Sequence, residues 1–170
     1  NAGIAIPDGS IGQTVIWEEV DYTAQNIFNL HSNAGAEATI FLDFDGHVTS
    51  GTLWNTQLNN GNDFTTLAYS TDGDRNSFST NDLMGIHEIW QRVAEDFAPF
   101  DVNVTTADPG TDALRQGGAD DTDSRHGVRV VIGPSTGMPS YFQGIGGVAY
   151  LYTFDYSADL PAFAFNGNSS

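Results

Sequence analysis

Apolar residues along the chain gather in short runs that are separated by polar, glycine-rich segments. The run at 38–44 is apolar on both faces at its centre, which is typical of a buried strand. Similar runs at 101–105, 127–132, 148–152 and 162–165 predict four more strands, of which the last is short. The pattern therefore predicts a sheet of short, largely buried strands.

One segment, about 80–97, has the spacing of an amphipathic helix instead. Its apolar residues recur at intervals of three and four positions: Leu83, Ile86, Ile89, Trp90, Val93, Ala94 and Phe97. Ser79 or Thr80 is suited to cap the helix at its N-terminus, and Pro99 is expected to end it. One long helix among these strands predicts an α/β fold.

Three segments lack a clear period. Residues 1–26 are mixed and turn-rich apart from a strand-like run at 14–17, and we interpret them as an N-terminal arm. Residues 49–78 are rich in Asn, Thr, Asp and Gly and are predicted to form a long loop, as are residues 107–126. With no internal repeat, residues 27–170 are predicted to form one sheet-containing unit.

The sequence predicts too few helices to cover both faces of the predicted sheet. A mostly parallel sheet buries both of its faces, whereas this sequence contains one convincing amphipathic helix, at 80–97. We therefore expect one face of the sheet to be left open. It would be covered by a partner chain, by missing sequence, or by the N-terminal arm.

The charge balance excludes several classes of partner. The chain of 170 residues has 22 Asp and Glu against five Arg and no Lys, a net charge of −17. Nucleic acids and anionic membrane surfaces require a basic footprint, so neither is expected as a partner. No apolar run approaches the roughly 20 residues of a membrane span, and with no cysteine there is neither a disulfide nor a thiolate metal site.

The beginning of the sequence bears on its location. Residues 1–3 are Asn-Ala-Gly, with no initiating Met and no charged or apolar region of a signal peptide. We therefore expect a processed product whose targeting segment has been removed. The acidic composition suits a secreted protein in saline or calcium-containing surroundings.

Two groups of carboxylates are candidate calcium ligands. Asp72, Asp74 and Asn76 alternate as in a calcium loop, but Ser77 and Leu83 occupy positions where an EF-hand has Gly and a bidentate Glu. The alternative is a polar turn before the helix cap.

The second group is Asp43, Asp45 and His47, at the end of the first predicted strand. Its D-x-D pattern also occurs in phosphatases with an aspartyl nucleophile, but those enzymes need a lysine, which this chain lacks. A structural role or a calcium site is therefore preferred for this group.

Three further motifs are weaker. His87 and Glu88 imitate the zinc-protease motif HExxH, but Gln91 replaces the second His, so a solvated helix face is preferred. Asn103 begins a glycosylation sequon that falls inside a predicted buried strand, and we discount it. The glycines of 144–147 precede a strand, which fits a bulge or an edge strand better than a dinucleotide loop.

Longer stretches of the chain resemble one family, the secreted bacterial zinc metalloproteases of the reprolysin-like, metzincin type. The resemblance covers about 27–165 and is most specific at 89–106, which joins the predicted helix to the next strand. The other segments that carry it are 28–32, 39–47, 51–55, 129–133 and 146–150.

The resemblance implies a metzincin-like upper subdomain, with a twisted, mostly parallel five-stranded sheet, an antiparallel edge strand and one long backing helix. The edge strand would pair with a peptide substrate through Gly146, Gly147, Val148, Ala149 and Tyr150. In the family, a helix carrying HExxHxxGxxH follows the fifth strand and holds zinc. None of the four histidines, His31, His47, His87 and His126, matches a family ligand, so no catalytic residue is carried over.

Three hypotheses remain. The chain is the N-terminal, substrate-cleft portion of a secreted zinc metalloendopeptidase, incomplete at its C-terminus, whose zinc ligands lie outside this chain. Alternatively, it is a catalytically inert extracellular calcium-binding or assembly module derived from that family. The third hypothesis is an unrelated acidic binding domain.

Overall fold

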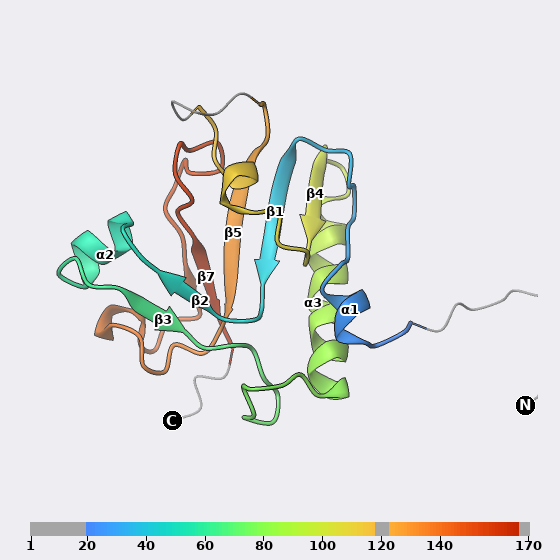
Figure 1. Cartoon of the computed structure of the whole chain (residues 1–170), viewed down its shortest axis with the longest axis horizontal. Coiled ribbons are helices and arrows are strands. Elements are labelled where there is room, and N and C mark those ends of the chain that lie inside the picture. Colours follow the sequence, from blue (N-terminus) through green and yellow to red (C-terminus); the bar gives the residue numbers. More distant parts are fainter. Residues whose placement is uncertain (1–19, 118–122, 167–170) are drawn as a thin grey trace, which may run out of the picture.

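The computed structural model describes residues 20–117 and 123–166, and Figure 1 shows their arrangement. The predicted α/β fold is confirmed: a five-stranded sheet, four of whose strands are parallel, lies against one long helix, α3. In spatial order the strands are β4 (Val102–Thr105), β1 (Ala38–Asp43), β5 (His126–Gly133), β7 (Ala162–Phe165) and β6 (Gly147–Val148). The edge strand β6 is antiparallel to β7.

Helix α3 (Thr80–Phe97) has the predicted bounds, and its start is fixed by a capping box. The Ser79 hydroxyl accepts a hydrogen bond from the Asp82 N–H (3.2 Å), while Asp82 Oδ2 accepts one from the Ser79 N–H (2.8 Å). Asp82 Oδ1 also accepts from the N–H and the hydroxyl of Thr71, at 2.6 and 2.8 Å. Of the two predicted caps, Ser79 is therefore the correct one.

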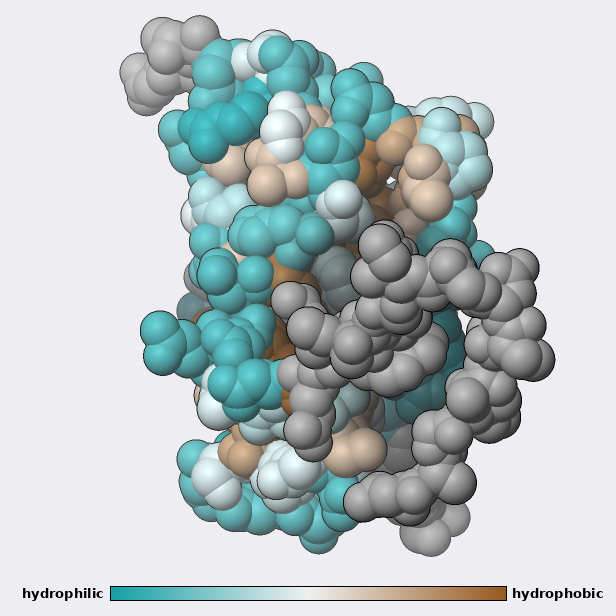
Figure 2. All heavy atoms as spheres, turned by 90° about the vertical axis from the view of Figure 1, so that its right-hand side faces the viewer, coloured by the Kyte–Doolittle hydropathy of each residue, from teal (hydrophilic) through white to brown (hydrophobic). Residues whose placement is uncertain are grey.

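The apolar stripe of α3 packs on one face of the sheet. Leu83 and Ile86 lie in a buried cluster with Ile40 and Leu42 of β1. At the outer strand, Trp90 donates a hydrogen bond from Nε1 to the carbonyl of Val104 (2.9 Å). On the side of the molecule seen in Figure 2, hydrophilic residues predominate, with hydrophobic ones between them. Glu88, Gln91, Arg92 and Glu95 of α3 are exposed, so the polar face of the helix is solvated, as the sequence predicts.

The other face of the sheet is covered by the chain itself, so the prediction that it lies open is wrong. The buried residues of this layer are Trp54, Phe64, Val131, Met138, Phe142, Leu160 and Phe163. They come from β5, from β7, from the predicted loop at 49–78 and from the connections that precede β6 and β7. Trp54 anchors the layer by donating from Nε1 to the carbonyl of Pro161 (2.8 Å).

Part of this cover comes from the predicted loop at 49–78, and that prediction is also wrong. The segment contains α2 (Leu53–Leu58) and β3 (Phe64–Thr66), which pairs with β2 (His47–Thr49). Its polar residues form internal hydrogen bonds: the fully buried Asn55 donates to the carbonyls of Thr49 (2.8 Å) and Asn62 (2.9 Å). High polarity therefore did not mean exposure here.

Three short elements complete the described chain. Helix α1 (Ala24–Ile27) lies in the predicted N-terminal arm and packs against α3, with Ile27 buried. The 3-10 helix η1 (Thr111–Leu114) lies against β5 within the predicted loop at 107–126, and η2 (Ser140–Phe142) carries Phe142 into the second layer. The strand-like run at 14–17 lies outside the described residues.

The strand predicted at 148–152 is only partly formed. Strand β6 stops at Val148, and Tyr152 is 93% exposed with φ at +63°, a left-handed conformation that cannot continue a strand. Tyr150 turns back instead: its ring packs against Trp54 in a tilted arrangement, with centroids 4.2 Å apart, and its hydroxyl donates to Gln57 (2.7 Å). Tyr150 thus belongs to the second layer rather than to a longer edge strand.

Apolar cover is incomplete on the α3 side of the sheet. Val128 and Val130 of β5 and Ala162 and Ala164 of β7 are only half-buried. Because Val128 and Val130 are paired in register with Ile40 and Leu42, they lie on the face against which α3 packs. The helix covers β4 and β1, and the neighbouring surface of β5 and β7 beside it is the partly uncovered strip.

We expect Ser79→Ala to destabilise the protein by about 1 kcal/mol, because α3 loses the hydroxyl that caps its first turn. Equilibrium unfolding in urea measures this change. Ser77→Ala is the matched control, since the Ser77 hydroxyl donates to the exposed Asp74 (2.8 Å) outside the helix. A loss at Ser77 as large as that at Ser79 would contradict the assigned cap.

Candidate functional site

A buried arginine is the centre of the most polar site inside the fold. Arg129 of β5 donates from Nη1 to Asp43 Oδ2 (2.7 Å) and from Nε to Asp159 Oδ2 (3.0 Å). The three side chains are only 8%, 2% and 12% exposed. The guanidinium carbon also lies 4.9 Å from the centre of the Phe41 ring. A full positive charge is thus held between two acids and an aromatic face.

The strand register brings these groups together. Phe41 of β1 is paired with Arg129, and Asp43 is paired with Val131, so alternate residues of the two strands share the face opposite α3. Asp159 comes from the segment that leads into β7. Residues more than 80 positions apart therefore meet because β1 and β5 are neighbours in the sheet.

Acceptors outnumber donors around Arg129. Asp108 lies 3.9 Å from Nη2, and Nδ1 of His47 lies 3.5 Å from Asp43 Oδ2. No described residue donates a hydrogen bond to the second oxygen, Oδ1, of either Asp43 or Asp159, although both atoms are buried. We call these five residues, Arg129, Asp43, Asp159, Asp108 and His47, the Arg129 cluster.

Burial shifts the protonation equilibria of this cluster. It raises the pKa of Asp43 to about 7, since the hydrogen bond from Arg129 only partly offsets desolvation and the neighbouring Asp45 adds to the rise. Burial and the Arg129 charge lower the pKa of His47, so its imidazole is neutral at neutral pH. Burial acts against the charge of Arg129, but Asp159 and Asp43 outweigh it and raise its pKa.

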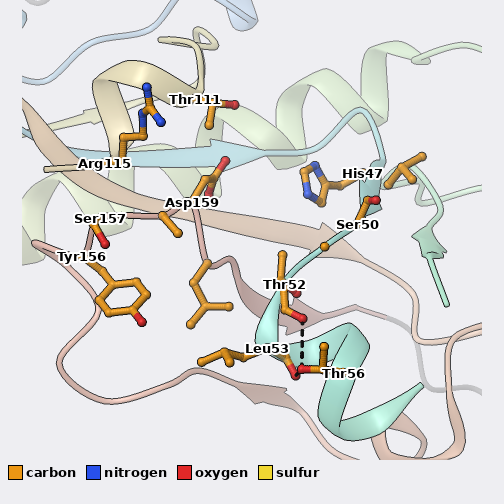
Figure 3. Close-up of a pocket in the computed structure, with 14 residues that line it drawn as sticks. His47, Ser50, Thr52, Leu53, Thr56, Thr111, Arg115, Tyr156, Ser157 and Asp159 are labelled. Atoms are coloured by element: carbon orange, nitrogen blue, oxygen red, sulfur yellow. Dashed lines mark hydrogen bonds between the residues drawn. The ribbon is translucent and has the colours of Figure 1, made fainter. Parts of the chain in front are cut away.

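A cavity of about 570 Å³ lies beside the cluster. His47 and Asp159 line it, and Figure 3 shows both with Leu53 of α2, Arg115 after η1 and Tyr156 of the loop before β7. We call it the α2–η1 cavity after these two elements. It is large enough for a small ligand or a long side chain.

Sequence reasoning found part of this site. It grouped Asp43, Asp45 and His47, and the structure places Asp43 and His47 in the cluster, while Asp45 is exposed beside them. It missed Arg129 and Asp159. A signal was available for Arg129, because an arginine within an otherwise apolar strand must be paired when buried.

The predicted calcium residues do not converge. Asp72 Oδ1 accepts from the Asp74 N–H (2.9 Å), and Asp74 Oδ1 accepts from the Asn76 N–H (3.0 Å), as in polar turns. Asp43 is instead bound to Arg129. Across residues 20–117 and 123–166 no group of three or more His, Cys, Asp or Glu side chains could hold a metal ion. Calcium binding therefore stays a prediction.

The HExxH-like segment serves packing and the helix surface. The His87 ring lies edge-on to Tyr22, with centroids 5.7 Å apart, and 5.9 Å from Trp90. Glu88 forms an exposed ion pair with Arg92 one turn later. Glu88 thus lies on the solvated helix face, as expected, whereas His87 is half-buried against aromatic rings.

The sequon is likewise unsuited to modification. Asn103 is 7% exposed, and its side chain bonds to His31 Nδ1 (3.1 Å) and to the Asn33 N–H (3.2 Å). Asn103, the first residue of the discounted sequon, is therefore a buried structural residue.

The predicted substrate strand is shorter than expected. Gly147 and Val148 form β6, and Gly146 precedes it, its carbonyl accepting from the Phe165 N–H (2.8 Å). Ala149 and Tyr150 lie outside the strand. Gly147 has to be a glycine, because a Cβ there would lie 2.7 Å from the carbonyl oxygen of Phe163.

Comparisons with known proteins add no assignment. No family model, no curated protein and no solved structure matches this chain. In the part of the chain that the structure describes, no helix is long and apolar enough to cross a membrane. The site must therefore be interpreted from its own geometry.

We expect Asp43→Asn to gain stability relative to the wild type as the pH rises from about 4 to about 7. The pKa of Asp43 is about 7 in the folded protein against an ordinary value of 3.8. Between these values the folded state keeps a proton that the unfolded chain has lost, so the free energy of unfolding falls with rising pH. The variant lacks this titration.

Urea unfolding at about pH 4.5 and about pH 7.5 tests this linkage. Asp63→Asn is the control for a general loss of negative charge, since Asp63 is exposed and is not among the groups that shift the pKa of Asp43. If the difference between Asp43→Asn and the wild type moved the other way with pH, Asp43 would instead be ionised by its arginine throughout the range.

Proposed function

We propose that this chain is the N-terminal, substrate-cleft portion of a secreted zinc metalloendopeptidase of the reprolysin-like, metzincin type. The observation that carries the proposal is the sheet topology. The fourth sheet strand in sequence, β6, lies at the edge and is antiparallel, while the fifth, β7, is inserted between it and the parallel strands. The single backing helix α3 and this order agree with the arrangement that the resemblance implies.

The role proposed for this chain is to present an edge strand to an extended peptide. The Gly146 carbonyl faces β7, where it accepts from Phe165. In an antiparallel ladder, alternate residues point to opposite sides, so Gly147 directs its N–H and carbonyl away from β7. In the proposed complex the peptide extends β6 by one residue, and Ala149 then becomes the next residue of this outward set. Backbone groups at a free edge can bind a peptide of many sequences.

The strip beside α3 is consistent with the same proposal. Val128, Val130, Ala162 and Ala164 leave an apolar surface that is half-buried. In the proposed enzyme this strip is covered by the polypeptide that carries the zinc-binding motif, either a further segment or a second chain. We thus propose that the missing polypeptide covers the face of the sheet on which α3 packs, and not the opposite face.

The described residues do not themselves fit a zinc site. His31, His47, His87 and His126 each contact different partners, and they come from separate elements of the fold. Zinc would be held by residues outside this chain and would supply the activated water of a metallopeptidase. This chain alone is therefore expected to be inactive, and its contribution is to bind and orient the substrate backbone.

The alternative is a catalytically inert extracellular calcium-binding or assembly module derived from the same family. The observation that favours it is the same half-buried strip, which suits docking of another subunit as well as a catalytic helix. The carboxylates of Asp72 and Asp74 are then the first candidates for calcium. A secreted location belongs to both proposals.

The decisive experiment uses the full-length gene product that contains this chain. We expect one zinc ion per molecule by elemental analysis, and cleavage of an unfolded protein substrate that a chelator abolishes and added zinc restores. The chain of 170 residues is the control and should be inactive. A full-length product with neither zinc nor peptidase activity would exclude the enzyme and leave the inert module.

Within this chain, we expect Ala149→Pro to lower kcat/KM of the full-length enzyme about 2- to 10-fold, because one backbone donor to the substrate is lost. Ala149→Val is the matched control, since it enlarges the side chain but keeps the N–H. If both variants lowered the rate equally, side-chain crowding rather than backbone pairing would explain the effect.

A further inference from the structure

Two segments without formal charge meet on one side of this acidic molecule. Residues 46–62 and 134–154 contain no Asp, Glu, Lys or Arg, so the 22 acids and five arginines of the chain all lie elsewhere. The fold brings the segments together: the Trp54 ring lies 4.2 Å from that of Tyr150, whose hydroxyl donates to Gln57 (2.7 Å). We call the exposed side of the two segments the uncharged surface. It is the part of the chain that a negatively charged partner can approach with the least repulsion.

A knob of two large hydrophobic side chains projects from this surface. Leu151 and Tyr152, which form the knob, are 80% and 93% exposed, the highest values for large hydrophobic residues in the part of the chain that the structure describes. The φ angle of Tyr152 is +63°, which is an outlier for a bulky residue. Backbone strain of this kind is concentrated at functional sites. The knob thus costs free energy in the isolated chain and would gain it by burial in a contact.

The α2–η1 cavity lies beside the knob. Tyr156 lines the cavity, and because four residues span at most about 14 Å, Tyr152 is close to it. Val48, Leu53 and Tyr156 give the cavity an exposed apolar rim, and Figure 3 shows the last two among its lining. A cavity of about 570 Å³ can admit a tyrosine side chain. The knob of the same molecule does not fill it, since Tyr152 is almost fully exposed.

We propose that the uncharged surface joins two copies of this chain, with Tyr152 of each copy inserted into the α2–η1 cavity of the other. A second copy brings both a knob and a matching cavity, and its acidic groups stay apart from those of the first when the uncharged surfaces meet. A two-fold axis in the contact plane, midway between knob and cavity, makes both insertions at once and closes the dimer. Depletion of charge and enrichment in tyrosine are typical of interface cores. The surface lies over the layer opposite α3, so the proposal is independent of the peptidase proposal.

Sedimentation velocity of the 170-residue chain over a range of concentrations tests the dimer. We expect a monomer–dimer equilibrium with a dissociation constant of about 10 to 100 µM, as for a small, transient contact. Raising the salt concentration from about 50 to about 500 mM should tighten the dimer, because it screens the repulsion between two molecules of like charge. A contact held by opposite charges would weaken instead.

Tyr152→Gly should weaken the dimer at least about 30-fold, the effect of losing a buried tyrosine at the centre of a contact. Glycine accepts a positive φ without strain, so this variant keeps the fold. Phe100→Ser is the matched control, because Phe100 is an exposed aromatic residue that follows α3, outside the uncharged surface, and its loss should leave the dimer unchanged. Ser157→Trp, which fills the cavity from its lining, should weaken the dimer about as much as Tyr152→Gly.

Mixing the two variants tests the insertion itself. Tyr152→Gly keeps an open cavity and Ser157→Trp keeps the knob, so one of the two insertions is restored in the mixed dimer, and the mixture should associate more tightly than either variant alone. The proposal is overturned if the wild type stays monomeric at the concentration of an NMR sample, or if Tyr152→Gly dimerises as tightly as the wild type. The latter comparison decides the matter if Ser157→Trp fails to fold. A mixture no tighter than the separate variants also overturns it, as does a loss at Phe100→Ser equal to that at Tyr152→Gly.

Discussion

Arg129 carries a permanent positive charge, because an arginine is not deprotonated in proteins. It lies in the middle of the central strand β5, where its guanidinium is almost completely buried. Removing such a group from water costs several kcal/mol unless good partners replace the solvent. Asp43 at the end of β1 and Asp159 before β7 provide them. The positions of both neighbouring strands are therefore coupled to one side chain.

The second layer of the protein is built around this constraint. Arg129 and Asp43 occupy the part of the sheet face near β1, whereas the aromatic layer of Trp54, Phe142 and Phe163 covers the part near β7. The tilted and edge-on ring contacts in that layer, with centroids 5.3 to 5.7 Å apart, add specific attraction to apolar burial. The sheet face opposite α3 thus has a polar part near β1 and an aromatic part near β7.

The sequence predicts the half of the fold in which pattern and burial agree. The strands at the centre of the sheet and α3 have the expected periods, and the cap at Ser79 is a local signal that tertiary contacts do not override. The segment at 49–78 was mispredicted because Asn55 and its neighbours satisfy backbone groups inside the fold, which composition alone cannot distinguish from solvation.

The same limit applies to the site. Asp43 and His47 are close in sequence and could be grouped from it. Asp159 lies near Arg129 only because β7, which it precedes, is the neighbour of β5 in the sheet. The acids that looked like calcium ligands at 72–76 bond mostly to groups of their own turn. A carboxylate that is near in sequence to others is therefore a weaker guide to a site than one brought near by strand register.

Helix α2 connects the α2–η1 cavity with the chain that follows the edge strand β6. Leu53, in its first turn, lines the α2–η1 cavity, and the next residue, Trp54, packs against Tyr150, two residues after β6. The capping box between Thr52 and Asn55 holds this turn, with Thr52 N–H donating to Asn55 Oδ1 (2.9 Å). The wall of the cavity therefore belongs to the element that supports the chain following the edge strand. The cavity and the chain after β6 thus both depend on α2, which lies in the segment that its polar composition predicted to be a loop.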